Sequence, residues 1–153
     1  MAHWQILRMV ELFLVGIGTG NPEHITIQAR RAIEEAGLIL IPYKGSEKSE
    51  LVDVRLKICK EIIKGKKTKI VQFDLPSRDL SYSYQEGVEK WHDNVASVWS
   101  SAIKENCSEA TKVAFLIWGD PSLYDSSLRI AERLKPKPKI HVFAGITSIQ
   151  ALT

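Results

Sequence analysis

The chain has 153 residues, of which 44% are hydrophobic and 25% are charged, and its formal net charge at pH 7 is +3. This length fits one domain with a sizeable core, and the composition excludes disordered and collagen-like classes. No apolar stretch approaches the roughly twenty residues that a membrane span requires. The first residues lack the apolar segment and cleavage site of a signal peptide, so we expect a cytoplasmic protein without a membrane partner.

Positive charge gathers in only two segments, residues 64–69 and 135–139, and both are expected to be solvated turns. Proteins that bind nucleic acid usually concentrate their positive charge, so no nucleic-acid partner is expected. The two cysteines, Cys59 and Cys107, have no cysteine or histidine beside them at metal-ligand spacing. We therefore expect reduced, structural cysteines and predict no metal site.

Short apolar runs alternate along the chain with segments of helical period. The runs predict strands at residues 11–17, 38–41, 69–73, 113–118 and 140–143. Apolar residues at helical spacing predict helices over about residues 26–36, 51–62, 88–106 and 128–134. We expect the second strand to end at Pro42, and the fourth, which is the most apolar, to lie in the centre of the sheet.

This alternation predicts an α/β domain with right-handed crossovers and a mostly parallel five-stranded sheet flanked by helices. We assign the domain to residues 9–153 and interpret residues 1–8 as an N-terminal extension or a remnant of expression. Thr147 and Ser148 are expected to cap a further helix, which the chain follows for less than two turns. A helix that short is marginal alone, so we expect more protein to follow in the complete fold.

Three short loops, residues 15–22, 118–125 and 144–148, each follow a predicted strand and precede a helical pattern. Because the carboxyl ends of parallel strands meet at one edge of a sheet, we expect the three loops to cluster there. That edge is where open α/β sheets bind their ligands. The sequence therefore predicts a ligand site built from these loops.

The first loop carries Gly16, Gly18 and Gly20 and so invites a dinucleotide-binding interpretation. Three features disfavour it: the third glycine is misplaced, Pro22 lacks an amide donor where a pyrophosphate would lie, and no acidic residue ends the second strand. NAD and FAD are therefore not expected. The alternative that these glycines merely form a tight turn stays open for this loop taken alone.

Two titratable residues, Asp120 and His24, lie within these loops. Asp120, at the end of the central strand, is placed to meet a cationic group such as an ammonium or a sulfonium, although Gly119-Asp120-Pro121 is also an ordinary turn sequence. His24 is a candidate proton donor or acceptor, and a surface or capping role is the simpler interpretation. No Ser-His-Asp or Cys-His arrangement is recognisable.

In combination, the three loops resemble those of the tetrapyrrole methylases, the S-adenosylmethionine-dependent enzymes of cobalamin and sirohaem synthesis. That family carries a Gly-x-Gly-x-Gly-Asp-Pro-like loop after the first strand, a Gly-Asp-Pro-x-x-Tyr loop after the fourth and a Pro-Gly-x-Thr-Ser-like turn after the fifth. The resemblance covers residues 11–153. Asn21 stands where the family commonly has Asp, and Ala144 where it commonly has Pro.

Within the family, residues 21–26, 43–45 and 118–130 resemble the branch of cobalamin synthesis that methylates C-1 of precorrin-5 and releases acetate to give precorrin-6A. That branch carries Asp after the motif tyrosine, here Asp125, where relatives usually carry Gly. The resemblance thus implies a C-methyltransferase whose cofactor is S-adenosylmethionine and whose substrate is a polycarboxylate tetrapyrrole.

The resemblance also implies roles for particular residues. The cofactor would be bound by Pro22, Gly119, Asp120, Leu123, Thr147 and Ser148, and the substrate would be bordered by Gly16, Gly18, Gly20, Asn21 and Tyr124. Lys44 and Arg129 are candidates to meet substrate carboxylates, with exposed surface roles as the alternative. Loss of the acetyl group requires a general base, for which His24 and Asp120 are the available candidates.

Members of the family have a second α/β domain after the Thr-Ser turn, bind the cofactor between the two domains and form homodimers. We therefore expect this chain to contain the first domain only, and a homodimer. Two alternatives remain: another methylase of the superfamily, acting on uroporphyrinogen, diphthamide or ribosomal RNA, or a non-catalytic dimerisation module.

Overall fold

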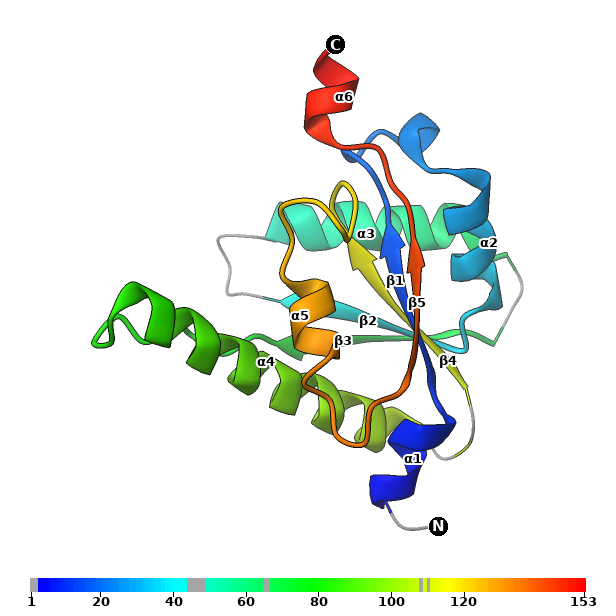
Figure 1. The fold of residues 1–153 in the computed structure, drawn as a ribbon. Helices are drawn as coiled ribbons and strands as arrows, with labels where there is room; N and C mark the ends of the chain where they lie inside the picture. The colour runs from blue at the N-terminus through cyan, green and yellow to red at the C-terminus, as the bar shows by residue number, and fades with distance from the viewer. Residues whose placement is uncertain (1–2, 44–48, 65–66, 108, 110) are drawn as a thin grey trace.

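The computed structural model describes residues 3–43, 49–64, 67–107, 109 and 111–153. Its strands are β1 (Glu11–Gly16), β2 (Leu38–Tyr43), β3 (Lys69–Asp74), β4 (Lys112–Ile117) and β5 (Lys139–Phe143). Its helices are α1 (His3–Met9), α2 (Ile27–Glu35), α3 (Ser49–Ile62), α4 (Tyr84–Asn106), α5 (Ser127–Ala131) and α6 (Ser148–Leu152), with a 3-10 turn η1 (Pro22–His24) (Figure 1).

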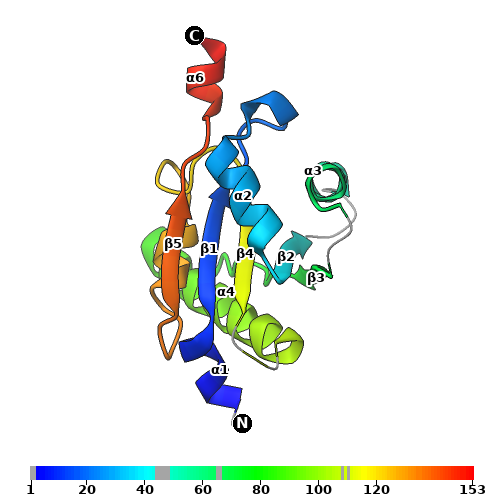
Figure 2. The ribbon, with the colours of Figure 1, turned by 90° about the vertical axis from the view of Figure 1, so that its right-hand side faces the viewer.

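The strands form one sheet in the order β3-β2-β4-β1-β5, and every pairing between these named strands is parallel. β4 lies in the centre of the sheet, as its apolar sequence predicts. Helices cover both faces, and Figure 2 shows α2 in front of the sheet and α4 behind it. The predicted α/β fold class is therefore confirmed.

Successive side chains of each strand enter opposite layers of the core. In β1, Leu12 and Leu14 pack in the layer of α1, α4 and α5, whereas Phe13 and Val15 pack in the layer of α2 and α3. All four side chains are at most 4% exposed. Burial on both faces explains why these strands appear in the sequence as continuous apolar runs instead of alternating ones.

Two details differ from the predictions. β2 continues past Pro42 to Tyr43, because β4 pairs with β2 only as far as Leu40 and the missing amide of Pro42 therefore faces no partner there. α1 lies within the segment interpreted as an extension, yet its Ile6 and Leu7 are 4% and 0% exposed and belong to the core. A helix of seven residues is too short to reveal its period in the sequence.

The predicted helix starts depend on threonine hydroxyls. Thr26 Oγ1 accepts a hydrogen bond from the amide of Ala29 at 3.0 Å, which caps α2. Thr147 caps α6 in a capping box with Gln150, while Ser148 is the first residue of that helix instead of part of its cap. None of the helices in the described part of the chain is long and apolar enough to span a membrane.

Both cysteine thiols are expected to be unreactive in the folded chain. Cys59 and Cys107 are 0% and 7% exposed, and burial raises the pKa of each thiol to about 11. Because the thiolate is the nucleophile, labelling with a thiol reagent at pH 8 should proceed only as fast as the chain unfolds. Fast labelling of either thiol without denaturant would contradict this placement, and labelling in guanidinium is the positive control.

Candidate functional site

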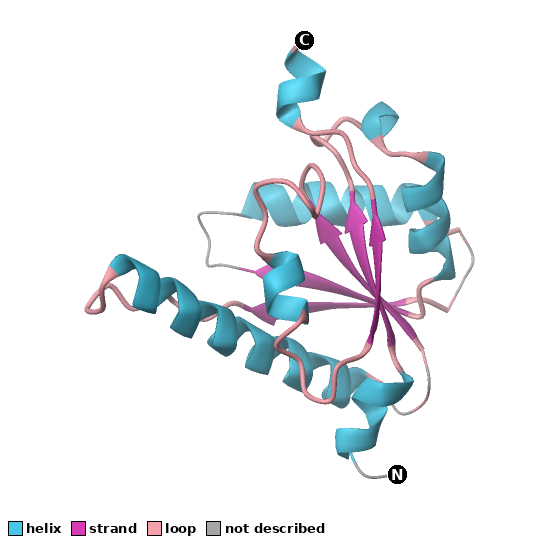
Figure 3. Ribbon diagram, in the orientation of Figure 1, coloured by secondary structure: helices cyan, strands magenta, loops and turns pink. Residues whose placement is uncertain are grey.

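Three loops meet at the carboxyl edge of the sheet, as predicted, where β1, β4 and β5 end side by side (Figure 3). The first two loops are joined directly through their backbones. The amide of Gly119 donates to the carbonyl of Gly18 at 2.8 Å, and the amide of Gly18 donates to the carbonyl of Gly119 at 3.4 Å. These two bonds close the edge between β1 and β4 beyond the last residues of the strands.

The third loop packs against the first two with no side chain between them. A Cβ atom on Gly145 would lie 2.0 Å from the carbonyl oxygen of Gly119, and one on Gly16 would lie 2.7 Å from the amide nitrogen of Gly145. Real Cβ atoms do not approach backbone atoms this closely. Glycine is therefore required at Gly16 and Gly145 for the loops to meet.

Asp120 fastens the second loop to the third. Its carboxylate accepts hydrogen bonds from the amide of Gly145 at 3.0 Å and from the amide of Ser122 at 2.8 Å, and from the Ser122 hydroxyl. Partial burial acts to raise the pKa of Asp120, but the bonds from Ser122 and Gly145 outweigh it and lower that pKa below the usual value. Asp120 is therefore ionised at neutral pH and engaged by both loops.

A cavity of about 640 Å3 opens where the loops meet, a volume typical of small-molecule sites. Its lining contains the predicted residues Gly18, Gly20, Gly119, Leu123, Tyr124, Thr147 and Ser148, together with Thr19, Leu51, Val54, Trp118 and Ile149. The predicted residues Gly16, Asn21, Pro22, His24 and Asp120 are not part of this lining. The sequence prediction thus locates the cavity and most of its wall.

Three glycines of this wall have backbone conformations that favour glycine, with φ of 75° at Gly18, 103° at Gly20 and 65° at Gly119. Gly18 and Gly119 use their amides and carbonyls to bond each other, whereas a Cβ atom on Gly20 would meet nothing closer than 3.6 Å, so a ligand can approach the backbone at Gly20. Tyr124 adopts a similar conformation, with φ of 55°, although it is not glycine. Its side chain is 94% exposed, so the strained residue stands at the mouth of the cavity.

Several of the predicted site residues use their polar side-chain atoms in hydrogen bonds to nearby residues. Thr147 Oγ1 is engaged in the capping box of α6, and Asn21 Oδ1 accepts from the amide of Glu23 at 3.0 Å to cap η1. His24 Nδ1 lies 2.7 Å from Thr19 Oγ1. Arg129 is exposed on α5 and lines neither this cavity nor the next, and Lys44 lies outside the described residues.

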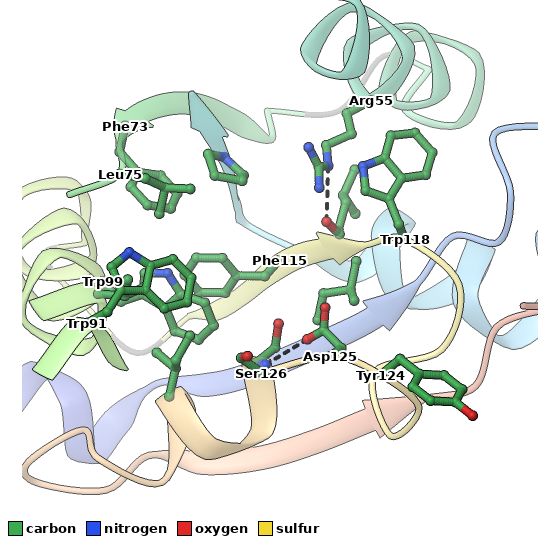
Figure 4. Close-up of a pocket in the computed structure, with 16 residues that line it drawn as sticks. Arg55, Phe73, Leu75, Trp91, Trp99, Phe115, Trp118, Tyr124, Asp125 and Ser126 are labelled. Carbon is green, nitrogen blue, oxygen red and sulfur yellow. Dashed lines mark hydrogen bonds between the residues drawn. The ribbon is translucent and has the colours of Figure 1, made fainter. Parts of the chain in front are cut away.

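A second cavity, of about 260 Å3, lies on the other side of Trp118 and Tyr124, which line both cavities. Figure 4 shows Arg55 and Trp118 at one side of it and Phe73, Leu75, Trp91 and Trp99 at the other. No loop motif in the sequence indicated this cavity. Arg55 is the residue in the sequence that could have indicated this cavity. The apolar stripe of α3 at Leu51, Ile58 and Ile62 continues through position 55, where a charged residue is unexpected.

With this geometry in place, comparison with known proteins gives the class of the chain. Residues 11–153 match the family described as Tetrapyrrole (Corrin/Porphyrin) Methylases, so the chain belongs to that family. The three loops that meet at the sheet edge carry the sequence motifs by which the chain resembles this family.

Individual relatives show which members of the family the chain is similar to. The chain is 41% identical over 149 residues to a Precorrin-6A synthase (deacetylating) from Sinorhizobium sp, an alignment that covers 94% of this chain and 57% of the relative. It is 27% identical over 144 residues to a Cobalt-precorrin-4 C(11)-methyltransferase from Methanocaldococcus jannaschii, covering 94% of this chain and 45% of the relative. The chain therefore spans about half the length of the curated relatives it matches.

Solved structures agree in fold. A putative cobalamin synthesis related protein (CobF) from Corynebacterium diphtheriae superposes with a TM-score of 0.73 at 37% identity, covering 95% of this chain and 57% of that one. Uroporphyrin-III C-methyl transferase from Thermus thermophilus, solved in complex with S-adenyl homocysteine, has a TM-score of 0.56 at 20% identity and covers 93% of this chain and 47% of that one. The second likeness concerns the fold alone.

Proposed function

We propose that the chain is the first domain of an S-adenosylmethionine-dependent C-methyltransferase of cobalamin synthesis, which methylates C-1 of precorrin-5 and releases acetate. The observation that carries this proposal is the cavity formed where the three loops of the family motif meet. The 41% identity to a precorrin-6A synthase favours this reaction over methylation of uroporphyrinogen, diphthamide or ribosomal RNA.

The cavity suits a cofactor with a polar chain and an apolar surface. The backbone at Gly20 and the hydroxyls of Thr19 and Ser148 would hold the polar parts, while Leu123 and Trp118 provide the apolar wall. When bound, S-adenosylmethionine supplies an activated methyl group for in-line displacement, so the protein has mainly to orient donor and acceptor. Asp120 contributes by holding the second and third loops in place.

Release of acetate requires a base, and His24 is favoured over Asp120 for that role. The lowered pKa of Asp120 makes its carboxylate a weak base, and its oxygens accept from Ser122 and Gly145. His24 instead has one ring nitrogen, Nδ1, beside Thr19 Oγ1 and a second nitrogen able to exchange a proton.

The proposal includes a second α/β domain that completes the cleft, a homodimer and a cytoplasmic location. The length of the relatives supports the second domain, because the precorrin-6A synthase is matched over only 57% of its length. In this arrangement Pro22, Asn21 and Ser148, which are exposed around the sheet edge, would face the cleft between the domains.

Calorimetry with S-adenosylhomocysteine tests the proposal. We expect a saturable heat of binding for the 153-residue chain, with NADH as a control ligand that gives none. Heat from NADH alone would reject a methyl-donor site in favour of a dinucleotide site, and no heat from either ligand would favour a dimerisation module. Mass analysis of products after incubation with each tetrapyrrole, in the presence of the second domain, separates the alternative substrates.

A further inference from the structure

The second cavity contains a buried cation, Arg55, that forms no ion pair within the described residues. Arg55 is 9% exposed, and its Nε donates to the carbonyl of Leu116 at 3.1 Å. No carboxylate in the described part of the chain forms an ion pair with it. Arg55 lines the cavity, and its guanidinium carries two further nitrogens that can donate to an acceptor entering there.

Arg55 remains charged in this place. Burial lowers the pKa of Arg55 to about 10, and the negative charge of Asp125 partly opposes that effect. At neutral pH the guanidinium is thus protonated. A buried charge is costly unless it is paired, so an anionic group at this point would be favoured by the site itself.

A second donor lies beside it. The guanidinium carbon of Arg55 is 5.0 Å from the ring centroid of Trp118, and the indole Nε1 of Trp118 is buried with no hydrogen-bond partner among the described residues. Figure 4 shows the two side chains next to each other at one side of the cavity. A guanidinium and an unpartnered indole N–H at one place suit an acceptor with more than one oxygen, such as a carboxylate.

The opposite wall is aromatic. Trp99 is 5% exposed and stacks on Phe115 with ring centroids 4.0 Å apart, and Phe73 meets Phe115 edge to face at 6.0 Å. Trp91 holds its place by donating from Nε1 to the carbonyl of Pro76 at 3.1 Å. A volume of about 260 Å3 is too small for a whole macrocycle, since even ordinary ligand sites exceed 300 Å3, but it suits one aromatic ring with a side chain.

We propose that this aromatic cavity binds one acid-bearing pyrrole edge of the tetrapyrrole, with Arg55 as the partner of its carboxylate. The inference rests on the proposed function and extends it to the way in which the substrate is held. Asp125, which lines the same cavity, provides an acceptor for a pyrrole N–H, since only its Oδ1 is engaged by the amide of Ser127. A phosphate has no such donor and carries more charge to be repelled by Asp125.

The position of the cavity fits methyl transfer. Trp118 lines both this cavity and the cavity proposed for the methyl donor, so a pyrrole bound beside Arg55 lies next to the donor. Arg55 therefore acts as a substrate-positioning residue.

Tryptophan fluorescence provides the test, because Trp91, Trp99 and Trp118 all line the cavity. The probe is porphobilinogen, a monopyrrole with two carboxylate side chains and an aminomethyl group, compared with its dimethyl ester, which keeps the ammonium charge and has no carboxylate. We expect the acid to quench the tryptophan fluorescence of the unmodified chain saturably and the ester to bind at least tenfold more weakly. Arg55→Met should weaken binding of the acid at least tenfold. The affinity of Arg55→Lys for the acid should lie between those of the unmodified chain and Arg55→Met.

Arg31→Met, an exposed arginine of α2, is the matched control and should change nothing. Each variant is also titrated with S-adenosylhomocysteine, whose unchanged binding shows an intact fold and an intact first cavity. Equal binding of acid and ester, no saturable quenching by the acid at millimolar concentration, or an unchanged affinity in Arg55→Met would overturn the inference. Failure of S-adenosylhomocysteine to bind the unmodified chain would instead reject the proposed function.

Discussion

Replacing Gly145 with alanine is expected to destabilise the chain by about 3 kcal/mol, which corresponds to roughly 10 °C in Tm. The new Cβ would lie 2.0 Å from the carbonyl oxygen of Gly119 and 2.9 Å from the backbone of Gly16, and no side chain can move to relieve either contact. The third loop must therefore leave the other two. We expect thermal unfolding to record the loss of stability and calorimetry to record the loss of S-adenosylhomocysteine binding.

Gly119→Ala is the control for this prediction. Gly119 has a φ of 65°, but its added Cβ would meet nothing closer than 3.7 Å. The cost there is backbone strain alone, about 1 to 2 kcal/mol. If Gly145→Ala were no more destabilising than Gly119→Ala, the result would contradict the close packing of the three loops.

Replacing Asp120 with alanine is expected to destabilise the chain by about 2 kcal/mol and to weaken S-adenosylhomocysteine binding at least tenfold. The change removes the acceptor for the amides of Gly145 and Ser122, which leaves the third loop without its polar link to the second. In the complete two-domain enzyme the same variant should lose methyl transfer. Near-normal turnover would refute this role for Asp120.

The effect of Asp120 should depend on pH in a particular direction. The folded pKa of Asp120 is lowered, so its stabilising effect is fully present above the unfolded value of about 3.9 and is lost as the pH falls through the folded pKa. The difference in unfolding free energy between the unmodified chain and Asp120→Ala should therefore be constant above about pH 5 and shrink in more acidic buffer. Asp53→Ala, at an exposed aspartate of α3, is the control for the loss of one negative charge and should change the unfolding free energy at pH 7 by no more than about 0.5 kcal/mol.

Most of the fold follows from patterns that are local in the sequence. The strands are buried on both faces and so form continuous apolar runs, and Thr26 marks the start of α2 through its hydroxyl. Packing of α1 could not be predicted, because two buried side chains, Ile6 and Leu7, show no period. The extension of β2 past Pro42 depends on where a neighbouring strand stops pairing, which is a property of the sheet and not of the segment.

The part of the candidate site that consists of glycine-containing loops after strands could be predicted from the sequence. Gly18, Gly20, Gly119 and Leu123 line one cavity because three strand ends meet at one edge. The role of Asp120 as a link to Gly145 was not predictable, since it depends on a contact between residues 25 positions apart. The cavity at Arg55 was missed because, apart from residues 118–130, its wall comes from β2, β3, β4, α3 and α4, which are far apart in the sequence.

The indole of Trp118 lines both cavities and so forms a partition common to them. A ligand that presses on this partition from one side changes the shape of the space on the other side. Thermodynamic linkage then requires that donor and acceptor alter each other's affinity by the same factor, whichever binds first. For the function proposed above, we therefore expect the two binding events to be coupled within a single domain.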